Sequence, residues 1–133
     1  MNRFGVQSRK ELQGCHRHLQ AVAPVVLRIK DHSIIKGHRG EQEQNQAFED
    51  GASELQWPDG KHNQIPSLAM DVQTYPRPAT EEALREEQLY LLGLYRGVGE
   101  TMDITIRTGA DWDQDGEIED NGFDDFFHVE VIV

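Results

Sequence analysis

A long amphipathic segment between Thr80 and about Gly99 constrains the fold of this 133-residue chain more than any other feature. A threonine followed by two glutamates is typical of a helix N-terminus, because the hydroxyl caps free amide groups and the acidic side chains favour the positive end of the helix dipole. Apolar residues then recur at helical spacing, at Leu84, Leu91, Leu92, Tyr95 and Val98. Such a stripe needs a partner surface, so we predict one main core helix covered by shorter elements.

Four short segments have the composition and the alternation of apolar residues that are typical of strands. They are residues 32–36, 68–72, 103–107 and 127–133. In the second segment Ala69 and Asp71 share one face, and in the last His128 and Glu130 share the face opposite Val129. Helices and strands in mixed order, joined mostly by loops, predict an α+β domain with a small antiparallel sheet and flanking helices.

The N-terminal region is predicted to be helical, with two interpretations of its course. Ser8 followed three residues later by Glu11 matches a capping box, which indicates a helix start. Apolar residues recur at helical spacing as far as Val26, but Pro24 interrupts them. Either one helix breaks just before that proline, or a first helix ends early and a second begins after Gly14.

Residues 41–50 are good helix formers followed by Gly51, and they include few apolar residues. We therefore expect a short helix on the surface, with the glycine ending it.

Charge excludes one class of partner. The chain has 13 Lys and Arg against 24 Asp and Glu, a formal charge of -11, which repels nucleic-acid backbones. We therefore expect no nucleic-acid partner and ask whether the acidic residues surround a cation. With 37% hydrophobic residues, the chain has enough apolar material for the core of one domain spanning residues 1–133.

The single cysteine, Cys15, cannot form an internal disulfide and is expected to be a buried helix residue. The N-terminus has no apolar run typical of a signal peptide, and no segment has the length of a membrane span. We therefore expect no membrane insertion and no export signal in the chain itself.

Histidine and acidic residues in two segments are candidates for a catalytic metal site. Such a zinc site uses three protein ligands and an open position, and with one cysteine those ligands must be His, Asp or Glu. His62 precedes the strand that carries Asp71, and His128 begins the last strand. Asp125 lies three residues before His128, where it could exchange protons with a metal-bound water. The alternative is that both histidines are ordinary surface or hydrogen-bonded residues.

The acidic loop that follows the third strand is a candidate calcium site. Its oxygen ligands alternate as in the opening of an EF-hand loop, with Gly116 at the turn. The candidate ligands are Asp111, Asp113, Asp115, Glu117 and Glu119. Gly122 stands where an EF-hand has its bidentate glutamate, so the alternative is a solvated acidic loop.

Three motifs together resemble a known family. They are KHNQIPSLAMDV at 61–72, Asp-x-x-His-x-Glu at 125–130 and IIKGHRGEQEQNQAFEDGAS at 34–53. This combination is similar to the D-Ala-D-Ala carboxypeptidase-like zinc peptidases, which include the L-alanyl-D-glutamate endopeptidase lysins of tailed bacteriophages. The resemblance implies the fold shared by these peptidases and the hedgehog signalling domain.

Carried over position by position, the resemblance places zinc ligands at His62, Asp71 and His128. The family's acidic catalyst falls on Asp125, and its substrate-facing arginine falls on Arg39. Such an arginine would stabilise the oxyanion that develops on the attacked carbonyl.

Departures from the carboxypeptidase pattern resemble the phage endopeptidase branch. Gly60 replaces a serine two residues before the first ligand, Asp125 replaces a glutamate, and Phe127 replaces a tryptophan. The resemblance therefore implies an endolysin that cleaves the L-alanyl-D-glutamate bond of peptidoglycan. The alternatives are a D-Ala-D-Ala carboxypeptidase or a metal-binding module without catalysis.

The resemblance also implies partners and a location. The expected substrate is the peptidoglycan stem peptide, and the expected cofactor is Zn²⁺, with Ca²⁺ as a candidate second ion. We expect a monomer without a separate cell-wall-binding domain. It would be made in the host bacterial cytoplasm and released by a holin-type pore protein to act in the periplasm.

Overall fold

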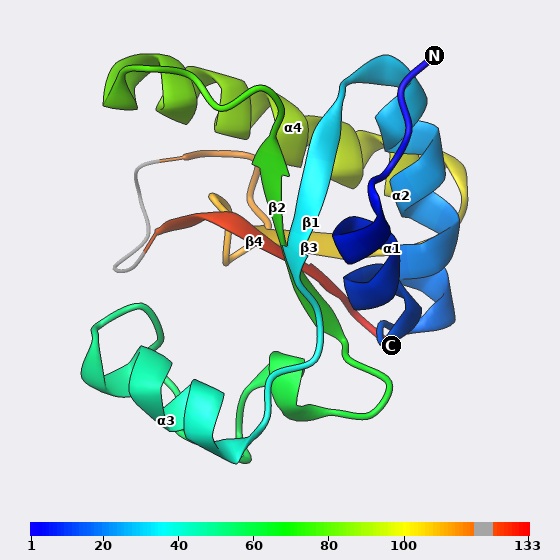
Figure 1. Ribbon diagram of the computed structural model, residues 1–133. Coiled ribbons are helices and arrows are strands. Elements are labelled where there is room, and N and C mark those ends of the chain that lie inside the picture. The colour runs from blue at the N-terminus through cyan, green and yellow to red at the C-terminus, as the bar shows by residue number, and fades with distance from the viewer. Residues whose placement is uncertain (119–123) are drawn as a thin grey trace.

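A four-stranded antiparallel sheet lies at the centre of the computed structural model, which describes residues 1–118 and 124–133 (Figure 1). The α+β class with a small antiparallel sheet is confirmed, because all three neighbouring strand pairs are antiparallel. In spatial order the strands are β1 (His32–Lys36), β2 (Ala69–Thr74), β4 (Asp125–Val131) and β3 (Ile106–Gly109).

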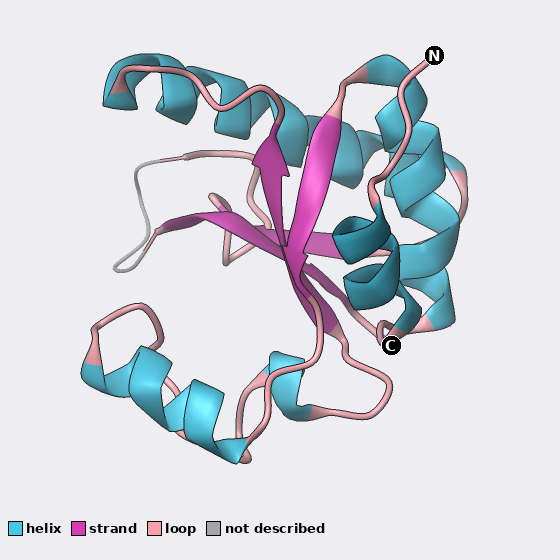
Figure 2. Ribbon diagram, viewed as in Figure 1, coloured by secondary structure: helices cyan, strands magenta, loops and turns pink. Residues whose placement is uncertain are grey.

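Helices pack on the sheet, and one helical segment lies apart from the others (Figure 2). The longest helix, α4 (Glu81–Thr101), contacts β2, β3, β4 and α2 (Arg17–Ile29), while α1 (Val6–Gln13) lies against β1. The separate segment is α3 (Glu41–Glu49), and the short 3-10 turn η1 (Lys61–Asn63) leads back toward β2. Among the described residues, none of the helices combines the length and apolar character that crossing a bilayer requires.

The core lies mainly between α4, α2 and the sheet. Leu91, Leu92 and Tyr95 of the predicted stripe are completely or almost completely buried, whereas Leu84 and Val98 are half-buried. Helix α4 begins after Thr80, whose hydroxyl accepts a hydrogen bond from a backbone amide, as predicted. The prediction of a main core helix is therefore confirmed.

The N-terminal region forms two helices, so the second interpretation is right. Helix α1 ends before Gly14, and α2 then runs through Pro24 without a break. His16 caps α2, because its Nδ1 accepts a hydrogen bond from the His18 amide at 3.1 Å. Cys15 is buried as predicted but lies between the helices, where it forms an isolated bridge with Ser67.

The predicted capping box is wrong, because α1 begins at Val6 and both of its residues lie inside the helix. Their side chains bind β1 and the residue that follows it instead. Ser8 Oγ accepts a hydrogen bond from the Ile34 amide, and Glu11 Oε1 accepts one from the Gly37 amide, each at 3.0 Å. The outer edge of β1 is thus covered by polar side chains of α1.

Strand β1 has the predicted bounds, whereas the boundaries of the other three strands differ from the predictions by one to three residues. Strand β2 continues to Thr74, while β4 begins at Asp125 and ends before exposed Val133. Strand β3 begins at Ile106, because Asp103 has a φ of 57° and turns the chain out of extended conformation first. The surface helix α3 has the predicted course and is followed by Gly51 at a positive φ of 78°.

A glutamine side chain ends the pairing between β2 and β4. The backbone ladder between these strands stops where Asp71 lies opposite His128. Beyond that pair, the fully buried Gln88 of α4 donates hydrogen bonds from Nε2 to the carbonyls of Val72 and Phe126, at 2.9 and 3.0 Å. The amide therefore bridges the strands at the point where they separate.

We predict that Gln88→Met destabilises the protein by about 2–5 kcal/mol, because each buried polar group left without a partner costs about 1–3 kcal/mol. The Thr74 amide, which donates to Gln88 Oε1 at 2.7 Å, would lose its partner as well. Urea unfolding measures the change in free energy. Gln42→Met, on the exposed face of α3, is the matched control and should change it by less than about 0.5 kcal/mol. Equal effects of the two changes would contradict the bridging role.

Candidate metal centre

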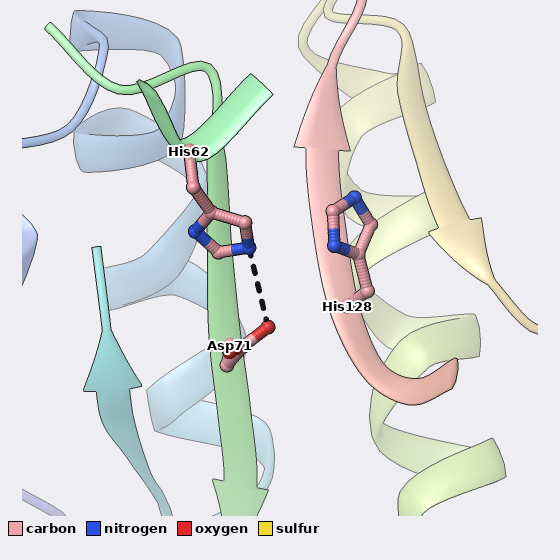
Figure 3. Close-up of side chains that lie close together, drawn as sticks. All are labelled: His62, Asp71 and His128. Atoms are coloured by element: carbon pink, nitrogen blue, oxygen red, sulfur yellow. Dashed lines mark ion pairs between the residues drawn. The ribbon is translucent and has the colours of Figure 1, made fainter. Parts of the chain in front are cut away.

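Three side chains that are far apart in the sequence meet at one point. His62 of η1, Asp71 of β2 and His128 of β4 each place one ligand atom within 4.8 Å of the others (Figure 3). His62 Nε2 lies 3.4 Å from Asp71 Oδ1, and the two imidazole rings are 5.3 Å apart between centroids. Asp71 and His128 are close because the strand register places them directly opposite each other.

Hydrogen bonds fix which imidazole nitrogens face this cluster. His62 Nδ1 donates to the Gly37 carbonyl at 2.8 Å, which leaves the lone pair of Nε2 directed at Asp71. His128 Nε2 donates to Glu130 Oε1 at 2.8 Å, which leaves Nδ1 on the side toward His62 (Figure 3). Acceptors on the outer nitrogens orient the rings of metal-binding histidines in this way.

The cluster also contains an oxygen without a partner. Among the described residues, none forms a hydrogen bond with the buried Oδ1 of Asp71. Burial raises the pKa of this carboxyl, but the contact with His62 and the charges of His128 and Arg39 outweigh burial, so the pKa lies below its usual value. Two imidazole nitrogens and one ionised carboxylate are a donor set that fits a divalent metal ion such as zinc.

Asp125 lies beside the cluster, at the first residue of β4. Gly109 of β3 makes this position possible, because a Cβ there would meet the Asp125 carbonyl oxygen at 1.9 Å. Burial, followed by the charge of Asp71, raises the pKa of Asp125. A carboxyl group with a raised pKa is suited to accept and return a proton near neutral pH.

Arg39 contacts the carboxylate oxygen of Asp71 that does not face His62. Its Nη2 is 3.3 Å from Asp71 Oδ2, and its Nη1 donates to Gln44 Oε1 at 3.1 Å. The Arg39 amide donates to the His62 carbonyl at 2.8 Å. Arg39 therefore forms an ion pair with a residue of the cluster.

The cluster opens on a cavity of about 750 Å³, a size that accommodates a peptide segment. His62, His128, Asp125 and Arg39 all form part of its wall. Other wall residues come from α3 and the loop after it, from η1, from β3, from the acidic loop and from β4. These are Ala52, Ser53, Glu54, Leu55, Asp59, Gly60, Lys61, Arg107, Trp112, Asp113, Glu130 and Gln44.

Glu130 is a further residue of the site, for which the sequence alone indicated no role. It is 2% exposed, and besides binding His128 it accepts a hydrogen bond from Arg107 Nη2 at 2.8 Å. Burial raises the pKa of Glu130, but the His128 hydrogen bond and the charges of His128, Arg107 and Lys61 outweigh burial and lower it. The motif Asp-x-x-His-x-Glu indicates that Glu130 lies beside His128, since residues two apart on a strand share a face.

Trp112 packs against the imidazole of His128, with ring centroids 4.9 Å apart. Nothing in the sequence indicated this contact, because the tryptophan lies in a loop.

The acidic loop brings together three of the five predicted calcium ligands. Carboxylate oxygens of Asp111, Asp113 and Asp115 lie within 4.8 Å of one another. Asp111 is also paired with Arg96 at 3.0 Å. Glu117 is not among the three, and the predicted ligand Glu119 lies outside the described residues.

Comparisons with known proteins agree on one family. A family model described as phage L-alanyl-D-glutamate peptidase matches residues 1–132. The L-alanyl-D-glutamate peptidase of Escherichia phage T5 is 29% identical over 135 residues, and the match covers 98% of each chain. The crystal structure of Serratia marcescens L-Ala D-Glu endopeptidase ChiX has a TM-score of 0.72 and 19% identity, covering 98% of this chain and 91% of that chain. This structural match supports the fold.

We predict that Glu130→Gln lowers the affinity for Zn²⁺ by about 10- to 100-fold, because the carboxylate that orients His128 is lost. Competition with a chelating dye measures this affinity. Glu100→Gln, at the exposed end of α4, removes the same charge at a distance and should leave the affinity unchanged. A loss of affinity in both variants would show that net charge, and not the orientation of His128, is responsible.

Proposed function

The chain belongs to the phage L-alanyl-D-glutamate peptidase family, and on this premise we propose that it is a zinc peptidase that cleaves the L-alanyl-D-glutamate bond of the peptidoglycan stem peptide. The observation that carries the proposal is the convergence of His62, Asp71 and His128 beside a cavity, with an unpartnered carboxylate oxygen at its centre. These three residues would hold the ion. When bound, zinc supplies a Lewis acid that polarises a carbonyl and lowers the pKa of water.

Asp125 is the proton carrier in this proposal. Its raised pKa allows the carboxylate to take a proton from the attacking water and return it to the leaving amine of D-glutamate. Its place in the cavity wall, three residues before His128 on the same strand, supports this role. A carboxylate in this position also favours a peptidase over a metal-binding module without catalysis.

Arg39 would stabilise the negative charge that develops on the attacked carbonyl oxygen. It belongs to the cavity wall, and its contact with Asp71 Oδ2 is long, at 3.3 Å. The guanidinium has five N–H donors, so it can hold Asp71 in place and still offer a donor to substrate.

The biological setting follows from the family. We propose that residues 1–133 form one catalytic domain, that it acts as a monomer, and that it lyses the host cell at the end of phage infection. It would reach the periplasm from the host cytoplasm through a holin-type pore. The match with the phage T5 relative over 98% of each chain supports a shared domain organisation, and the formal charge of -11 argues against a nucleic-acid partner.

We predict that Asp125→Asn retains one zinc ion per chain but slows peptidoglycan cleavage by about 100- to 10,000-fold, because the proton carrier is lost. Metal analysis and mass spectrometry of digested peptidoglycan measure the two properties. Asp103→Asn is a matched control at an exposed position and should keep full activity. Wild-type digests should contain stem peptides that begin with D-glutamate. Release of free D-Ala instead would indicate a carboxypeptidase.

We also propose that the acidic loop binds Ca²⁺ through Asp111, Asp113 and Asp115, whose carboxylates converge. An ion there would hold these three carboxylates in one arrangement. Calorimetric titration of the zinc-loaded protein with CaCl₂ should give a binding heat that Asp113→Asn weakens. Absence of heat, with no change in activity, would leave a solvated acidic loop.

A further inference from the structure

Two basic side chains meet at one end of the cavity, around the carboxylate of Glu130. Arg107 Nη2 lies 2.8 Å from Glu130 Oε2, and Lys61 Nζ lies 3.5 Å from the same oxygen. Both side chains are about one-third exposed, and both belong to the cavity wall. We call Lys61 and Arg107 the basic corner.

The basic corner has more positive charge than its own carboxylate can neutralise. Glu130 carries one negative charge and is shared by Lys61, Arg107 and the N–H of His128. The four groups keep a net positive charge in either protonation state of His128. This is unusual in a chain with 24 acidic and 13 basic residues, and it lies beside a candidate metal centre.

Lys61 is the residue of the basic corner whose N–H donors are available to a substrate. Arg107 is held by the short contact with Glu130 and lies over the Trp112 ring, 5.8 Å from its centroid. The Lys61 ammonium has three donors, yet its distance to Glu130 is long, and the described part of the chain gives it no closer ion pair. Lys61 also precedes His62 on the three-residue turn η1, which fixes it next to the cluster.

The substrate presents a matching group. Cleavage of an L-alanyl-D-glutamate bond releases the amino group of D-glutamate, and the α-carboxylate is attached to the same carbon as that amino group. When the stem peptide continues through the γ-carboxyl, the α-carboxylate stays free. Glu54, Asp59, Asp113 and Asp125 also line the cavity, so binding a further carboxylate there requires a cation.

We propose that Lys61, supported by Arg107, binds the α-carboxylate of the D-glutamyl residue and so selects stem peptides in which this group is not amidated. This inference rests on the proposed peptidase function and adds a specificity residue to it. Arg107 keeps Glu130 in place, and the Lys61 ammonium forms the charge-assisted contact with the substrate.

Three synthetic peptides test the proposal on the zinc-loaded chain. The first is acetyl-L-Ala-γ-D-Glu-L-Lys, the second carries an amide at the D-Glu α-carboxyl, and the third carries an amide only at the C-terminus. We expect the second peptide to lose about tenfold or more in kcat/KM, mainly through KM, and the third to react like the first. A loss confined to the third peptide would place the recognised carboxylate on the next residue and overturn the assignment.

Substitution of Lys61 should remove this preference. Lys61→Gln is expected to cleave the first peptide about tenfold less efficiently and the second with unchanged efficiency, while Lys61→Arg restores discrimination. Lys36→Gln, which breaks a pair with Glu43 outside the cavity wall, is the matched control and should behave like wild type. Equal losses of Lys61→Gln on both peptides would show that Lys61 only supports Glu130.

A binding measurement separates this inference from the function itself. Calorimetry with the Asp125→Asn variant, in which cleavage is slowed, should show tighter binding of the first peptide than of the second. Failure of the wild type to hydrolyse any of the peptides would contradict the proposed function, whereas equal affinity for the two peptides would contradict the role of Lys61.

Discussion

The pairing of Asp71 with His128 across two antiparallel strands is the constraint on which the site depends. Since side chains alternate between the faces of a sheet, a slip of one residue would turn either group into the apolar core. The buried Val72 and Val129 next to them hold that register. Where the strands separate, the Gln88 side chain replaces the backbone hydrogen bonds by donating to a carbonyl of each strand. The strand register therefore brings Asp71 and His128 together, and the separation of the strands beyond this pair leaves space beside them.

Three carboxylates within this small region have different environments. Asp71 faces imidazoles and a guanidinium, and its pKa is lowered despite burial. Glu130 is surrounded by donors and is also kept ionised. Asp125, with burial and the negative charge of Asp71 against it, has a raised pKa. Residue type alone gives no such division, because it arises from the partners that each group meets in the fold.

Sequence patterns predicted the elements with strong periodicity and the residues in compact motifs. The stripe of α4 and the alternation in β4 depend on the sequence alone, so both were predictable with small errors at their ends. Ser8 and Glu11 were misassigned because their partners are the amides of Ile34 in β1 and of Gly37 just after it, which local spacing does not show. Lys61 and Trp112 had no assigned role, since their places in the cavity wall depend on how loops fold back onto the sheet.

Gly37 connects the N-terminus of the chain to the imidazole of His62. Its amide binds Glu11 of α1, and its carbonyl accepts the proton of His62 Nδ1, so one residue is held from both sides. A Cβ at this position would lie 2.4 Å from the Glu11 carbonyl oxygen, so the close contact requires glycine. For protein engineering, a change that unwinds α1 would disturb a histidine that lies 51 residues after Glu11 in the sequence, whereas Val133 is exposed and lies outside β4.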